Sequence, residues 1–243
     1  MSIARSLEYL SNPNPQFEQR YVEVRAKEGR ILSDSQVAQL PITEETYVHA
    51  AEWKKRVNTL KLFSTYLNNR KAQAILAVGC GNGWFTNRIA PYCAEITSLD
   101  VNTTELEQAD QLFENDKIKF IYAELFTAPL PLAKYDIIVF NASIQYFPDL
   151  KALLNRCKDL LIEDGEIHIL DSPFYDSAST LEAKERTDRY FKSIGAPEAA
   201  SYYFHHDRAA VNTFNSEIVY KPTFFTKLIT KHYSPFPWIR IRK

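Results

Sequence analysis

Short apolar runs of strand length alternate with longer amphipathic stretches along most of the chain after residue 49. The runs are nearly continuous in apolar residues, which suits strands buried on both faces, whereas the stretches repeat apolar residues at helical spacing. This alternation predicts an α/β fold with a parallel sheet covered by helices on both faces. The predicted strands are 75–78, 95–99, 118–122, 135–140, 166–170, 217–220 and 238–241.

The clearest helical pattern lies at residues 49–67, immediately before the first predicted strand. Apolar residues recur there at steps of three and four, so they share one face of a helix. This predicted core face consists of Trp53, Val57, Leu60, Phe63 and Leu67.

Two later helices carry start and stop signals. Thr104 and Glu107 have the spacing of a capping box for the helix that follows the second strand. Pro148 and Asp149 are typical first residues of a helix, which we expect to continue through Leu161 until Asp164 and Gly165 stop it. Further helices are predicted at 181–193 and 224–230.

The N-terminal part, residues 1–68, is predicted to be a helical extension. A mixed polar and aromatic segment at 17–27 favours a helix that ends at Gly29. A second short helix is expected at 33–40, where Pro41 terminates it. The extension serves either as a lid or as a packing appendage, and the sequence leaves both open.

Charge and cysteine content narrow the class of protein. The 29 basic and 30 acidic residues nearly cancel, which disfavours a dedicated nucleic-acid binder, although a local basic patch or a macromolecular acceptor stays open. Cys80, Cys93 and Cys157 lie far apart and indicate neither a disulfide framework nor a zinc site. With no apolar stretch of membrane-spanning length, we expect a soluble, cytoplasmic protein without metal ligands.

A glycine-rich loop follows the first predicted strand. Gly79, Gly81 and Gly83 occupy alternate positions, where they allow backbone conformations closed to other residues and a close approach of the chain to a ligand. The next helix directs its free N–H groups at the same place. The loop therefore predicts a site for a nucleoside-bearing cofactor, the alternative being a glycine-rich connection without a ligand.

This GxGxG stretch resembles the first motif of class I S-adenosylmethionine-dependent methyltransferases. The dinucleotide fingerprint GxGxxG needs a glycine where this chain has Trp84. The resemblance extends over roughly residues 50–243. It implies a Rossmann-like, doubly wound, mostly parallel sheet of seven strands with an antiparallel last strand, a methyltransferase domain at 69–243, and a substrate-side insertion at 171–210.

The resemblance also implies a set of residues that bind S-adenosylmethionine. The loop would contribute Gly79, Cys80 and Gly81, and Asp100, followed by Val101, would accept hydrogen bonds from the ribose. In similar enzymes an acidic residue after the third strand and the next backbone N–H meet adenine, which matches Glu124 and Leu125. Asn141 lies at the end of the fourth strand. Arg56 is either a partner of the methionine carboxylate or a solvated arginine.

Methyl transfer needs no signature catalytic residue, because the cofactor supplies the activated methyl group. His205 and His206 are candidate bases, since histidine titrates near neutral pH, and Tyr146 is another candidate near the substrate. A purely structural role stays open for each of them. His168 lies within a predicted buried strand and is expected to be packed and hydrogen-bonded.

Two departures from the family pattern are relevant. Ala77 replaces an acidic residue often found two places before the first glycine, and residues 141–144 read NASI rather than an NPPY-like motif.

Taken as a whole, the sequence is expected to encode a methyltransferase that transfers the methyl group in line to a small-molecule acceptor. The alternatives are a non-catalytic cofactor-binding module of the same fold and a nicotinamide-dependent oxidoreductase.

Overall fold

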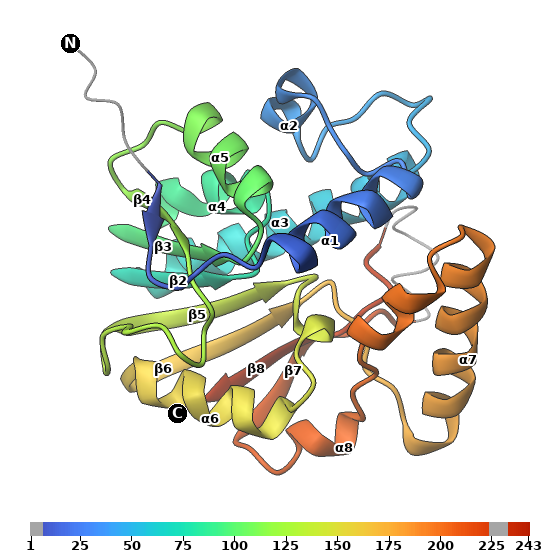
Figure 1. Cartoon of the computed structure of the whole chain (residues 1–243). Coiled ribbons are helices and arrows are strands. Elements are labelled where there is room, and N and C mark those ends of the chain that lie inside the picture. The colour runs from blue at the N-terminus through green and yellow to red at the C-terminus, as the bar shows by residue number, and fades with distance from the viewer. Residues whose placement is uncertain (1–6, 224–232) are drawn as a thin grey trace.

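An eight-stranded sheet organises residues 7–223 and 233–243, which are the residues described in this computed structural model. Its strand order is β1-β4-β3-β2-β5-β6-β8-β7 (Figure 1). The strands are β1 Glu8–Tyr9, β2 Ala74–Val78, β3 Glu95–Asp100, β4 Ile118–Tyr122, β5 Tyr135–Asn141, β6 Leu161–Leu170, β7 Ser216–Tyr220 and β8 Trp238–Arg242.

Neighbouring strands from β1 to β6 are parallel, and β8 runs antiparallel to both β6 and β7. The predicted Rossmann-like α/β fold, with a mostly parallel sheet and an antiparallel last strand, is thus confirmed. All seven predicted strands are present. The short strand β1 is an addition that the sequence did not indicate, and it extends the sheet edge by pairing Glu8 with Ile121 and Tyr9 with Tyr122.

Helices cover both faces of the sheet (Figure 1). They are α1 Pro15–Lys27, α2 Asp34–Gln39, α3 Ala50–Arg70, α4 Trp84–Ile89, α5 Thr103–Leu112, α6 Leu150–Leu160, α7 Ser177–Ser193 and α8 Arg208–Val211. Three short 3-10 helices lie at Ala90–Tyr92, Ile144–Tyr146 and Pro197–Tyr202.

Alternate side chains of β2 enter two separate hydrophobic cores, because successive strand residues point to opposite faces. Leu76 and Val78 pack in the core that contains the apolar face of α6. Ile75 and Ala77 pack in the core formed with α3, α4 and α5. Burial on both faces explains why β2 is apolar throughout.

The structure corrects three details of the helices. Val57 is 40% exposed, and Thr59 is buried in its place, because the buried face of α3 is rotated relative to the predicted one. Helix α5 is capped by Asn102, whose side chain accepts a hydrogen bond from Glu105 N, so Thr104 already lies inside the first turn. Helix α6 ends at Leu160.

Strand β6 begins directly at Leu161, which is extended and pairs with Tyr135. Gly165 therefore lies within a strand rather than at a helix end. A Cβ atom there would lie 2.8 Å from the Leu161 Cβ, so the irregular pairing of β6 with β5 requires glycine.

The helix predicted at 224–230 falls outside the described residues.

Candidate functional site

The glycine loop between β2 and α4 has positive φ angles at Gly79, Gly81 and Gly83. Gly79 N and Cys80 N both donate to Leu99 O, which turns the chain sharply after the strand. A Cβ atom on Gly79 would lie 2.5 Å from the Ser143 Cβ. Glycine is therefore required both by the backbone conformation and by the close approach of the β5 end.

Asp100 lies at the carboxyl end of β3 and holds this loop in place. Its Oδ2 accepts a hydrogen bond from Gly81 N at 2.7 Å, and its Oδ1 accepts from Val101 N at 2.8 Å and Asn102 N at 3.1 Å. Burial raises the pKa of Asp100, and these backbone N–H groups oppose that effect. The carboxylate thus joins the glycine loop to the start of α5.

A second carboxylate, that of Glu105, lies beside Asp100 in the first turn of α5. Burial, together with the neighbouring charge of Asp100, raises the pKa of Glu105 to about 7, whereas Arg25 and a hydrogen bond with Tyr21 act in the opposite direction. Asn102 also lies here, and its Nδ2 is buried without a hydrogen-bond partner. The end of β3 thus presents carboxylate acceptors and one unused amide donor.

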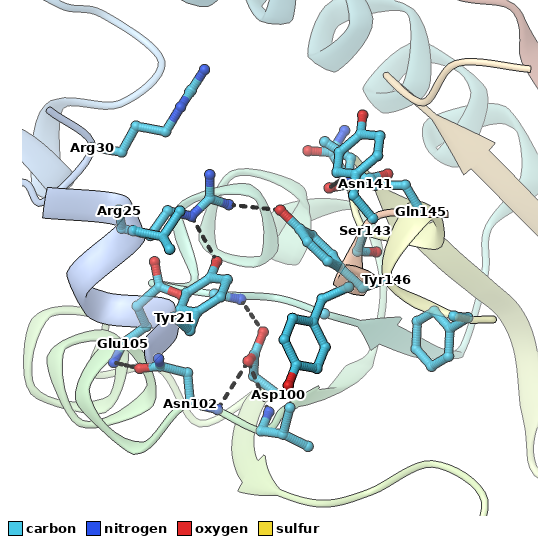
Figure 2. Close-up of a pocket in the computed structure, with 18 of the residues that line it drawn as sticks. Tyr21, Arg25, Arg30, Asp100, Asn102, Glu105, Asn141, Ser143, Gln145 and Tyr146 are labelled. Carbon is cyan, nitrogen blue, oxygen red and sulfur yellow. Dashed lines mark hydrogen bonds between the residues drawn. The ribbon is translucent and has the colours of Figure 1, made fainter. Parts of the chain in front are cut away.

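Helix α1 lies over the carboxyl ends of the central strands and brings Tyr21 and Arg25 to this place (Figures 1 and 2). Arg25 Nε donates to the Tyr21 hydroxyl at 2.9 Å, and Arg25 Nη2 donates to the Tyr146 hydroxyl at 3.2 Å. Burial raises the pKa of Tyr21 well above its ordinary value, so the phenol is neutral at physiological pH.

The ends of β5 and β6 meet through Asn141 and Asp171. Asn141 Nδ2 donates to Asp171 Oδ2 at 3.2 Å, and Asp171 Oδ1 accepts from Thr59 Oγ1 at 2.7 Å and Ser234 Oγ at 3.0 Å. Asp171 and Ala142 both have positive φ, an uncommon conformation for residues with a side chain. Two adjacent strand ends are therefore held in strained backbone geometry at one place.

These elements surround a cavity of about 1320 Å³. A drug-sized ligand occupies a pocket of roughly 300–1,000 Å³, so the cavity has room for a cofactor and an acceptor together. One end lies at the glycine loop and the ends of β3 and β4. The other is walled by α1, by the 3-10 helix Ile144–Tyr146 and by α7.

All of the predicted cofactor residues line this cavity, namely Gly79, Cys80, Gly81, Asp100, Val101, Glu124, Leu125, Asn141 and Arg56. Arg56 is partly buried, and its Nε and Nη2 both donate to Glu52 Oε1, at 3.0 Å and 2.7 Å. Glu124 N donates to Ser11 Oγ, so the N-terminal segment reaches the end of β4. Burial raises the pKa of Cys80, which leaves its thiol neutral.

The candidate bases separate into two groups. Tyr146 lines the cavity. His206 is buried with its Nε2 3.1 Å from Ile144 O, and His205 lies 2.9 Å from Thr187 Oγ1, so both contact protein atoms behind the wall. Burial lowers the pKa of both histidines. His168 is fully buried and accepts a hydrogen bond from Trp238 Nε1 on Nδ1, as expected for a structural histidine.

Tyr21, Arg25 and Glu105 are site residues that sequence reasoning missed. Tyr21 and Arg25 are four residues apart and so share one face of α1, which was the available signal. Glu105 follows Asp100 closely on the predicted helix, but nothing in its spacing distinguished it from a surface glutamate.

Within the described part of the chain, no three His, Cys, Asp or Glu side chains are grouped to hold a metal ion. Nor do residues 7–223 and 233–243 include a helix that is long and apolar enough to cross a membrane.

Residues 76–169 match a family model described as a methyltransferase domain. An uncharacterised methyltransferase of Mycobacterium tuberculosis is 32% identical over 98 residues, which are 40% of this chain and 50% of that protein. The malonyl-[acyl-carrier protein] O-methyltransferase of Acetivibrio thermocellus is 30% identical over 151 residues, covering 59% and 53%. The 27-O-demethylrifamycin SV methyltransferase of Amycolatopsis mediterranei is 26% identical over 177 residues, covering 67% and 65%.

Solved structures share the fold at lower identity. A Mesorhizobium loti S-adenosylmethionine-dependent methyltransferase superposes with a TM-score of 0.54 at 16% identity, covering 79% of this chain and 98% of that one. A Haemonchus contortus phosphoethanolamine N-methyltransferase 2, solved with S-adenosyl-L-methionine, superposes with a TM-score of 0.54 at 15% identity. The match covers 83% of this chain and 49% of that one.

The curated relatives are matched over only part of their length, since this chain spans 50% to 65% of the three named above. The residues that match the family model include most of β2, the glycine loop and Asp100. Motif, family model and strand order agree that residues 76–169 match a methyltransferase domain and that the chain has the fold of S-adenosylmethionine-dependent methyltransferases.

Proposed function

We propose that this protein transfers a methyl group from S-adenosylmethionine to a small-molecule acceptor. The observation that carries the proposal is the single cavity that joins the glycine loop to a wall of polar and aromatic side chains on α1 and α7. The named relatives that act on an oxygen atom, among them the malonyl-[acyl-carrier protein] enzyme, favour an oxygen acceptor.

The residues at the loop end of the cavity fit the cofactor. Gly79 and Gly81 leave the loop backbone free of side chains, and carboxylates at the end of β3 are acceptors for ribose hydroxyls. The unpartnered amide of Asn102 is a donor for a polar atom of the ligand. Glu124 and the backbone of Leu125 would hold the adenine, and Arg56 with Gly79 and Asn141 would surround the methionine end.

When bound, the cofactor supplies a methyl group already activated by a sulfonium leaving group. The residues of this chain then have to orient the acceptor and exclude water. The strained ends of β5 and β6 fix Asn141 and Asp171 through the hydrogen bonds with Thr59 and Ser234. Helix α1 closes the cavity from above, so we assign the role of a lid to α1, whereas α3 packs in the core.

The segment 171–210 is assigned to the acceptor side. Tyr175, Thr187 and Tyr203 come from this segment and line the cavity. A cytoplasmic location is part of the proposal, because Cys80, Cys93 and Cys157 are all free thiols, the usual state in a reducing compartment.

Calorimetric titration of the whole chain with S-adenosylhomocysteine and with NAD tests the cofactor assignment. We expect micromolar binding of the first and binding of NAD at least about a hundredfold weaker, since Trp84 occupies the place of the third dinucleotide glycine. Equal binding of the two ligands would refute the proposal.

The matched variants are Asp100→Asn and Asp149→Asn. The first removes an acceptor from the loop hydrogen bond to Gly81 N and should weaken S-adenosylhomocysteine binding about tenfold or more. The second changes the same charge at the N-cap of α6, away from the cavity, and should change the affinity less than about twofold, because asparagine is an equally good cap.

A further inference from the structure

Five alternating charged residues form a chain of ion pairs along the roof of the cavity, here called the roof network: Arg25, Glu28, Arg30, Glu52 and Arg56. The successive N to O distances are 3.1 Å from Arg25 to Glu28, 3.7 Å from Glu28 to Arg30, 2.7 Å from Arg30 to Glu52 and 2.7 Å from Glu52 to Arg56. All five residues line the cavity.

The roof network contains three guanidinium groups and only two carboxylates. Its members are largely withdrawn from water, with 8% of the Glu28 side chain and 18% of the Arg56 side chain exposed. Burial would raise the pKa of Glu52, but the charge of Arg56 and the hydrogen bond from Arg30 lower it to about 2, so Glu52 is ionised. Outside the network, the carboxyl groups of Asp100 and Glu105 at the end of β3 also act on Arg25 and help to balance its charge.

The Arg56 end of the network belongs to the cofactor half of the cavity. The Arg56 guanidinium lies 5.0 Å from the centroid of the Trp53 ring, and Trp53 meets Trp84, the residue after Gly83, edge to face at 5.0 Å. Both carboxylate oxygens of Glu52 are engaged by arginines at this end.

The Arg25 end lies between Tyr21 and Tyr146, and the Glu105 carboxyl is also nearby (Figure 2). Arg25 shares one carboxylate oxygen of Glu28 with Arg30, and it also donates hydrogen bonds to the hydroxyls of Tyr21 and Tyr146. Because a guanidinium has five N–H donors, two remain. The Tyr146 oxygen is the acceptor in its bond with Arg25, so the hydroxyl proton of Tyr146 is also available as a donor.

Aromatic rings flank this end of the cavity. Tyr146 lies edge-on to Tyr21 with ring centroids 6.3 Å apart and edge-on to Tyr203 with centroids 6.1 Å apart. Hydrogen-bond donors of Arg25 and Tyr146 next to these aromatic rings suit a ligand that is itself a ring carrying an anionic group.

We propose that Arg25 and Tyr146 form an acceptor subsite for a carboxylate, and that the natural acceptor is an aromatic or similarly flat molecule bearing one. The inference rests on the proposed methyltransferase function. The carboxylate pairs with the free N–H groups of Arg25 and accepts a hydrogen bond from the Tyr146 hydroxyl. Tyr146 is then a positioning residue for the acceptor rather than a base.

The test compares benzoate with benzamide, which have the same ring and differ in charge. Each is titrated by ligand-observed NMR into the whole protein saturated with S-adenosylhomocysteine. We expect benzoate to bind about tenfold or more tightly than benzamide. Equal affinities would overturn the proposal, as would the absence of benzoate binding.

Variants locate the subsite. Arg25→Gln should abolish the preference for benzoate, and Tyr146→Phe, which keeps the ring and the network charges, should reduce it several-fold. Arg189→Gln removes a guanidinium that pairs with Glu185 on the exposed face of α7 and serves as the matched control with an unchanged preference. If Tyr146→Phe folds like the wild type and keeps the full preference, the subsite is not where we place it.

A second pair of ligands separates this subsite from the cofactor's own carboxylate. S-adenosylhomocysteine has that carboxylate and 5′-methylthioadenosine lacks it. Arg25→Gln should leave both affinities within about threefold of the wild type, whereas a selective loss of S-adenosylhomocysteine binding would assign Arg25 to the cofactor and overturn the proposal. If the wild-type protein binds neither nucleoside, the proposed methyltransferase function is refuted independently of the subsite. The preference for benzoate over benzamide can then still be measured in the absence of a nucleoside.

Discussion

Gly83 and Gly195 both have positive φ, but only Gly83 is enclosed by other atoms. A Cβ atom on Gly83 would lie 2.7 Å from the Phe120 ring and 2.8 Å from the Ala109 Cβ, whereas a Cβ on Gly195 would have no atom within 4 Å. The third glycine of the motif is therefore a packing requirement between the loop, α5 and β4. Gly195 only needs the left-handed backbone conformation.

This difference predicts unequal costs for the same substitution. Gly195→Ala should lower the free energy of unfolding by about 1–2 kcal/mol, the cost of a left-handed alanine. Gly83→Ala should cost about 1–3 kcal/mol more, because the added methyl group overpacks the site. Urea unfolding of the two variants beside the wild type measures both free energies of unfolding. Equal losses of stability would show that the Phe120 ring moves aside for the added methyl group without cost.

The sequence indicated site residues that depend on local spacing and missed those that depend on the tertiary fold. Gly79, Gly81 and Asp100 follow strand ends, and a strand end is recognisable from a few neighbouring residues. Tyr21 and Arg25 reach the site only because α1 crosses the sheet, and that crossing leaves no trace in the local pattern. His205 and His206 were selected by residue type, but their contacts are with Thr187 and with the backbone of Ile144.

Helix α1 is attached to the rest of the protein differently from α3. None of its residues is fully buried, and polar bonds hold it, including Thr103 N to Glu18 Oε2 at 2.8 Å and Lys27 Nζ to Gly195 O at 2.6 Å. Helix α3, by contrast, buries Trp53, Phe63 and Leu67. Few apolar contacts mean that α1 can open at a small free-energy cost while the core stays folded.

Hydrogen exchange should resolve these two helices. In the free protein the amides of α1 are expected to exchange at least about tenfold faster than those in the middle of α3, and saturating S-adenosylhomocysteine should slow α1 selectively. The middle of α3 provides the internal control. Equal protection of the two helices, or an α1 that does not respond to the ligand, would argue against a lid.

At the level of elements, the apolar pattern was sufficient to predict the main strands of the sheet. It was not sufficient to predict which face of a helix is buried or where each element begins and ends. All seven predicted strands form, because each is a distinct apolar run. The buried face of α3 includes Thr59 rather than Val57, since the polar cavity lies beside it and Thr59 donates to Asp171. The two-residue strand β1 is too short to give a pattern.

Across the whole molecule, Glu166 joins the C-terminal strands to α3. It is buried on β6 and lies 3.3 Å from Arg240 of β8 and 3.6 Å from Arg70 of α3, and the Tyr66 hydroxyl donates to it. Burial would raise its pKa, but hydrogen bonds with His168 and Tyr66 and the charge of Arg240 lower the pKa of Glu166 to about 2. The ionised carboxylate therefore stabilises the folded state.

Glu166→Gln should lower the free energy of unfolding at pH 7 by about 3 kcal/mol, because the buried carboxylate charge that pairs with the partly buried Arg240 and Arg70 is removed. Glu217→Gln, which removes an exposed partner of the same Arg240, should cost less than about 1 kcal/mol.

The folded-state pKa of Glu166 is depressed, so its contribution is present above the ordinary pKa near 4.5 and is lost as the pH falls toward 2. The difference between wild type and Glu166→Gln in urea unfolding should therefore be smaller at pH 3.5 than at pH 7. A difference that stays constant over this interval would mean that Glu166 is not held ionised by the network.

The position of helix α1 ahead of its contact partners in the sequence has a consequence for biosynthesis. Its polar contacts are with residues made later, and Gly195, which accepts the bond from Lys27, is synthesised 168 residues afterwards. At ribosomal rates this delay is on the order of 10–30 s. Helix α1 is thus synthesised well before some of its partners and docks after them, and the cavity beneath it is open to solutes while the sheet assembles.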